Sequence, residues 1–119
     1  MRQGVKHVVQ SSPSDRRQDL RVSLELHCKL EIAEIELAAM ITDLSLGGAG
    51  ITLAFPIPRF TGSQVRSVNI DQIGRLKVVH RWRTSNRIGV AFESQATARP
   101  RIRDFFDANG IDIGEGARP

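Results

Sequence analysis

The chain has 119 residues and a mass of 13.2 kDa, with 40% hydrophobic and 25% charged residues, which is typical of one globular domain with its own core. No apolar run approaches the ~20 residues that a membrane span needs, the N-terminus lacks the apolar stretch of a secretory signal, and a single cysteine excludes an intramolecular disulfide. We therefore expect a cytoplasmic protein, and the net charge of +4 favours anionic partners.

Arginine supplies most of this positive charge, because only three of the 17 basic residues are lysines. Arginine offers a planar fork for phosphates and a flat face for stacking, whereas lysine offers mainly a point charge. The bias therefore suits a phosphorylated ligand that contains bases, although genomic base composition explains it equally well.

The N-terminal half of the chain predicts an arm followed by a hairpin. Residues 1–15 are polar, and the Ser-Ser-Pro-Ser run within them predicts a flexible arm. From Val22 to Ile32 apolar and polar residues alternate strictly, which indicates a half-buried strand. A change of phase at 33–34 predicts a turn, and 35–41 forms a second alternating stripe that should pair antiparallel with the first.

The rest of the chain predicts more short strands and one helix. A turn over 43–48 leads to a strand at 49–55, and the prolines and glycine of 56–63 indicate a loop. Three further strands follow, and then an amphipathic helix at 97–109 with Pro100 in its first turn and Gly110 as its stop. The glycine-rich residues 111–119 read as a frayed tail. The three strands are expected at 65–70, 76–82 and 88–93.

Two polar motifs flank the predicted hairpin. Arg16-Arg17-x-x-x-Arg21 precedes its first strand, and Asp43-x-Ser45-x-x-Gly48 follows its second. Because antiparallel pairing brings the two ends of a hairpin together, both motifs can lie at the same end of the domain.

In this order the motifs resemble the signature of the PilZ domain, an RxxxR stretch followed by (D/N)xSxxG. The segments ITDLSLGGAGITL and VVHRWR…RIGVAFE are also similar to that family, and the resemblance covers residues 15–95. RxxxR alone carries little weight, because the spacing recurs at Arg83/Arg87 and Arg99/Arg103. The resemblance implies a mainly β fold over 16–110, a six-stranded antiparallel PilZ-like β-barrel with a C-terminal α-helix.

The resemblance also implies cyclic di-GMP as the ligand. Arginine forks can engage the O6 and N7 acceptors of guanine or the phosphates, and Asp43 can accept from guanine N1–H and N2–H₂. The alternative is that the acidic turn only caps its own backbone and that the arginines only keep the arm soluble. The implied ligand-binding residues are Arg16, Arg17, Arg21, Asp43, Ser45, Gly47 and Gly48.

Other candidate side chains add little chemistry. Packing is the commoner role for a lone strand tryptophan such as Trp82, and a secondary ligand contact is the alternative. The three histidines lack metal-ligand spacing, and Cys28 falls on the apolar face of the first strand, as expected of a small buried hydrophobe. Without a catalytic constellation, we expect neither an enzyme nor a metal or other cofactor.

The leading hypothesis is a single-domain receptor and adaptor. Cyclic di-GMP would change the conformation of the N-terminal arm, and the protein, a monomer or weak dimer, would act on a separate, unidentified protein partner. The resemblance implies a bacterial cytoplasm and outputs such as motility or biofilm control. Two alternatives are a PilZ-like adaptor without ligand binding and a basic nucleic-acid-binding small barrel. With 5% aromatic residues and no tyrosine, binding of DNA or RNA is not expected.

Overall fold

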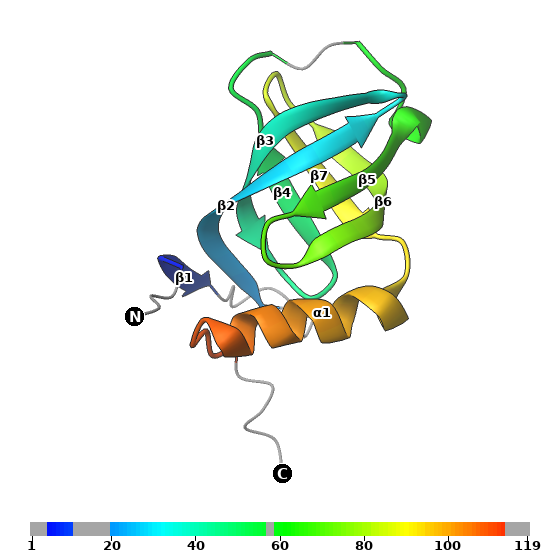
Figure 1. The fold of residues 1–119 in the computed structure, drawn as a ribbon. Helices are drawn as coiled ribbons and strands as arrows, with labels where there is room; N and C mark the ends of the chain where they lie inside the picture. Colours follow the sequence, from blue (N-terminus) through cyan, green and yellow to red (C-terminus); the bar gives the residue numbers. More distant parts are fainter. Residues whose placement is uncertain (1–4, 11–19, 57–58, 114–119) are drawn as a thin grey trace.

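The computed structural model describes residues 5–10, 20–56 and 59–113, which form one antiparallel sheet rolled into a barrel and one helix across its end (Figure 1). Most strands alternate between apolar and polar residues, so one face of each turns inward and the other outward. The elements are β1 (His7–Gln10), β2 (Arg21–Ile32), β3 (Ile35–Leu44), β4 (Gly48–Thr52), the 3₁₀ helix η1 (Gly62–Gln64), β5 (Val65–Ile70), β6 (Gly74–Arg83), β7 (Arg87–Phe92) and α1 (Gln95–Ala108).

Six of the strands close the barrel in the order β2-β3-β4-β7-β6-β5, and β5 pairs back with β2. All these pairings are antiparallel, which confirms the predicted six-stranded barrel with a C-terminal helix. Two predicted strand ends differ by three residues: β3 continues to Leu44 rather than ending at residue 41, and β4 ends at Thr52 rather than residue 55. After β4, Leu53 donates its N–H to the Asn86 carbonyl in the neighbouring turn.

Side chains on the outer surface reinforce the seam where β5 meets β2. Ser67 is only 4% exposed, and its hydroxyl donates to Glu31 Oε1 at 2.8 Å. Arg75 of β6 donates to the same carboxylate oxygen at 3.1 Å and to the Ser67 hydroxyl at 3.2 Å. One polar cluster therefore joins three strands at the closure of the barrel.

The interior of the barrel is one continuous apolar core. Every second residue of β2 from Val22 to Ile32 is buried, as the alternation predicts. The predicted stripe of β3 holds less well, because Ile35 at the hairpin tip is 60% exposed. The largest fully buried side chains are Phe106, Leu30, Ile41, Leu44, Leu46, Ile51, Ile70, Ile88, Ile102, Val22 and Val68.

Helix α1 lies across one end of the barrel and completes the core from there (Figure 1). It begins earlier than predicted, since the Ser94 hydroxyl accepts the Thr97 N–H at 3.2 Å as an N-cap. Pro100 consequently lies in the second turn rather than the first. The predicted stop at Gly110 is confirmed: its φ is +68°, and Ile111 N–H reaches back to the Phe106 carbonyl at 2.8 Å, which is a Schellman ending.

Within both predicted flexible ends, some of the described residues are packed against the domain. Within the arm expected over 1–15, β1 pairs antiparallel with the start of β2, so Gln10 lies opposite Arg21. Val5 N–H also donates to Asn109 Oδ1 at 3.1 Å, which ties this segment to the end of α1. In the tail expected over 111–119, Ile111 is 3% exposed and belongs to the core. Short apolar segments have no periodicity to reveal such long-range packing.

Candidate ligand site on the outer face of the barrel

A row of four cross-strand neighbours crosses the outer face of β3, β4, β7 and β6. Asp43 pairs with Gly50, Gly50 with Gly89, and Gly89 with Trp82. Each glycine lies between two buried residues of its strand, so each faces outward. We call these four residues the outer row: a floor of two glycines with a carboxylate at one end and an indole at the other.

Two irregularities in strand pairing turn the ends of the outer row outward. Strict alternation from the buried Ile41 would point Asp43 into the core, but the register shifts between them, and Leu44 is the next inward residue. Likewise, alternation from the buried Val78 would turn Trp82 inward, and the register shifts between His80 and Trp82. Both bulges therefore convert core positions into surface positions.

The outer row requires glycine at two positions because neighbouring side chains lie directly against the backbone there. A Cβ on Gly50 would fall on the Asp43 carboxylate, and a Cβ on Gly89 would fall on the indole of Trp82. The carboxylate and the indole therefore lie directly over the glycine backbone, and Trp82 remains 40% exposed. Trp82 thus packs on the outer surface of the barrel and not in its core.

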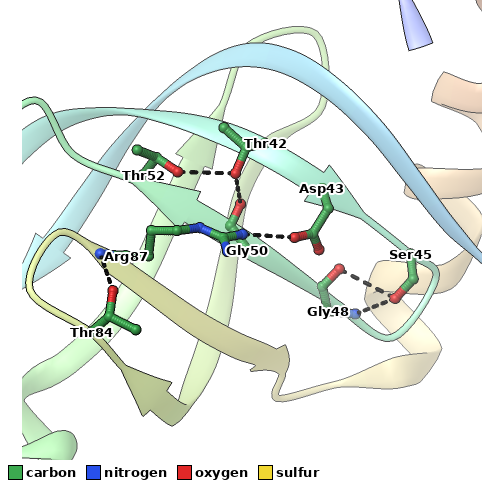
Figure 2. Close-up of polar contacts among 8 residues, drawn as sticks. All are labelled: Thr42, Asp43, Ser45, Gly48, Gly50, Thr52, Thr84 and Arg87. Carbon is green, nitrogen blue, oxygen red and sulfur yellow. Dashed lines mark hydrogen bonds and ion pairs between the residues drawn. The ribbon is translucent and has the colours of Figure 1, made fainter. Parts of the chain in front are cut away.

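Arg87 of β7 bridges the two ends of the outer row. Its Nη2 lies 3.1 Å from Asp43 Oδ2 (Figure 2). Its guanidinium carbon lies 5.4 Å from the centre of the Trp82 ring. Its backbone is fixed by Thr84, whose hydroxyl accepts the Arg87 N–H at 3.1 Å and whose N–H donates to the Arg87 carbonyl at 2.8 Å. The side chain of Asp43 is 23% exposed and that of Arg87 41%, so water reaches this ion pair.

The turn between β3 and β4 is held by Ser45. Its hydroxyl accepts from the Gly48 N–H at 3.2 Å and lies 3.4 Å from the Gly48 carbonyl oxygen (Figure 2). The same hydroxyl accepts from the Gly47 N–H at 3.3 Å, and the Ser45 N–H donates to the Gly48 carbonyl at 2.9 Å. Neither glycine is among the described residues with positive φ. Gly48 is instead needed for close approach, because a Cβ there would fall on the Val90 carbonyl oxygen.

The structure brings only part of the predicted site together. Asp43 near the end of β3, Ser45 and Gly47 in the turn, and Gly48 at the start of β4 belong to one hairpin. Arg21 begins β2 beside this hairpin, because the next residue, Val22, pairs with Leu44. Arg16 and Arg17 lie outside the described residues. Asp43 does not cap its own turn, because its partner is Arg87 on another strand.

Sequence reasoning missed three residues of this surface. Gly50 and Gly89 carry no motif, and Arg87 entered only as one end of a chance RxxxR spacing. Their role depends on the registers of β4, β7 and β6. One signal was available in the sequence: strict alternation from the apolar Ile41 would bury the charged Asp43, which indicates a break in the alternation between them.

A separate cavity of about 730 Å³ lies beside β5 and β6, lined by Arg66, Lys77 and His80 among others, and includes no member of the outer row. In the described part of the chain no cluster of histidine, cysteine and carboxylate groups could hold a metal ion. Burial raises the pKa of the Cys28 thiol to about 12, as expected of an inert buried hydrophobe. Among the described helices, none is long and apolar enough to span a membrane.

The chain is thus a closed antiparallel barrel with a terminal helix and a polar surface on its outer wall. A family model described as "PilZ domain" matches residues 15–107, so the chain belongs to the PilZ domain family, a family of cyclic di-GMP receptors.

A solved structure has the same fold. The crystal structure of YcgR in complex with c-di-GMP from Escherichia coli superposes with a TM-score of 0.53 at 22% sequence identity, covering 92% of this chain and 63% of that chain. This chain thus spans less than two thirds of the YcgR chain. A search of curated proteins found no match.

Proposed function

We propose that this protein is a cyclic di-GMP receptor that binds its ligand on the outer face of the barrel, around the Asp43–Gly48 turn and the outer row. The observation that carries the proposal is the outer row itself, which presents a hydrogen-bond acceptor and an aromatic face at opposite ends of a glycine floor. A guanine base needs both: an acceptor for its N1–H and N2–H₂ donors and a surface on which to stack.

The remaining residues supply contacts for the phosphates and the second base. Arg21 is exposed beside the Ser45 turn, where its fork can bind a phosphodiester or the O6/N7 edge of guanine. Arg16 and Arg17 are proposed to share these tasks from the segment that precedes β2. In the free protein Ser45 organises the turn, and its hydroxyl is proposed as a further contact together with Gly47 and Gly48.

Ligand binding is proposed to change the conformation of the segment that joins β1 to β2, and a separate protein partner is proposed to read that change in the cytoplasm. Two facts support a role for this segment. It carries Arg16 and Arg17, and its ends are adjacent because Gln10 pairs with Arg21. The proposed role is that of an adaptor and not an enzyme, with outputs of the family's kind, motility or biofilm control.

Isothermal titration calorimetry with cyclic di-GMP tests the proposal. Wild-type protein is expected to bind, and Asp43→Ala or Arg21→Ala to weaken binding by about tenfold or more, because each removes a charge-assisted hydrogen bond. Arg66→Ala is the matched control, an exposed arginine on β5 away from the outer row. Absence of heat with wild-type protein, together with tight salt-sensitive binding of single-stranded RNA, would favour the nucleic-acid alternative.

A further inference from the structure

Asp43 presents its two carboxylate oxygens to different surroundings. Oδ2 lies over Gly50, where a Cβ would fall on it, and accepts from Arg87 Nη2 at 3.1 Å. Oδ1 has no hydrogen bond to a described residue. One oxygen is therefore fixed against the barrel, and the other is contacted by no donor from the described part of the chain.

The charge of this carboxylate matters for the ligand class. Cyclic di-GMP carries two phosphodiesters, each with one negative charge, and a carboxylate beside them repels the ligand unless a cation compensates it. Within the described residues, the one ion pair of Asp43 is with Arg87. Arg87 also lies over the Trp82 ring, so the same guanidinium contacts both ends of the outer row.

We propose that Arg87 is a positioning residue for dinucleotide binding: it neutralises Asp43 and fixes Oδ2, so that Oδ1 can accept from the ligand without electrostatic repulsion. This inference rests on the proposed function and deepens it. Arg87 is needed because residue 43 is charged, and Arg87 becomes dispensable when residue 43 is neutral.

A double-mutant cycle measures this coupling directly. Arg87→Gln leaves Asp43 uncompensated, and calorimetry is expected to show cyclic di-GMP binding weakened on the order of tenfold. Asp43→Asn keeps a carbonyl acceptor and removes the charge, so adding it to R87Q is expected to restore binding to within about threefold of D43N alone. Arg66→Gln, which removes one positive charge from β5, controls for the general loss of attraction and should change binding less than about twofold at 0.15 M salt.

Two results would overturn the proposal. Unchanged binding by R87Q would show that Asp43 needs no compensation. Equal losses from R87Q in the wild-type and D43N backgrounds would show that Arg87 acts on the ligand and not through Asp43.

A measurement without ligand separates this inference from the proposed function. Trp82 is the only tryptophan, so its fluorescence reports the position of the Arg87 guanidinium. D43N is expected to change Trp82 emission in the free protein, because it releases Arg87 from its ion pair, and R66Q is expected to leave it unchanged. If the wild-type protein binds no cyclic di-GMP while D43N still changes Trp82 emission, the proposed function is refuted and the Asp43–Arg87–Trp82 linkage stands. If D43N leaves Trp82 emission unchanged, the linkage is refuted whether or not the ligand binds.

Discussion

Replacing each glycine of the outer row by alanine should displace one proposed ligand-binding side chain at a time, Trp82 in one variant and Asp43 in the other. In Gly89→Ala the new Cβ falls on three atoms of the Trp82 indole, which must leave the strand. In Gly50→Ala it falls on the Asp43 carboxylate, which must turn away together with Arg87. Both obstacles are side chains, so we expect each variant to remain folded, in contrast to Gly48→Ala, where the obstacle is the Val90 backbone.

The expected losses follow from the contacts removed. A base stacked on an aromatic side chain contributes about 1–3 kcal/mol, so G89A should weaken cyclic di-GMP binding by about 5- to 150-fold. A hydrogen bond to a charged group contributes about 1.5–3 kcal/mol, so G50A should weaken it by about 10- to 150-fold. Calorimetry gives the affinities, and a red shift of Trp82 emission in G89A verifies that the indole has moved. A red-shifted G89A that binds as tightly as wild type would refute stacking on Trp82.

Three further predictions concern the fold. Because the pKa of the Cys28 thiol is raised to about 12, the thiol stays protonated at pH 8, and a chromogenic disulfide reagent should label it only after denaturation; rapid labelling of native protein would contradict its burial. Asn109→Ala removes the acceptor for Val5 N–H and the donor to the Phe105 carbonyl, and should cost about 1–3 kcal/mol and speed amide exchange in β1; unchanged exchange would show that β1 is held by other contacts. Ala33→Gly relieves a φ of +57° in the β2–β3 turn and should stabilise the protein by about 0.5–1 kcal/mol in thermal unfolding, whereas a lower Tm would contradict the assigned turn.

The sequence predicts the barrel well because its strands are amphipathic over their own length. The alternation from Val22 to Ile32 identifies both the longest strand and its buried face, and the Asp43–Gly48 turn follows from residues that favour turns. These are local signals, which a single sequence contains in full.

The outer row could not be predicted in the same way, because it depends on register between strands distant in sequence. Gly50 meets Gly89 only when β4 pairs with β7, and the bulges that turn Asp43 and Trp82 outward break the alternation used for prediction. β1 escaped notice for a related reason, since four residues have too little pattern to indicate that they pair with β2. The motif residues were thus identifiable from sequence, whereas the surface around them required the structure.

The central claim is that cyclic di-GMP binds on the outer face of β3, β4, β7 and β6, and a two-dimensional NMR titration of ¹⁵N-labelled protein tests it most directly. The single indole N–H of Trp82 and the amides of Ser45, Gly48, Gly50 and Gly89 report on this face without any substitution. We predict that these signals shift and saturate together, while amides of β5 such as Arg66 and Asn69 stay in place. An unchanged spectrum at millimolar ligand, or shifts confined to β5, would contradict the claim.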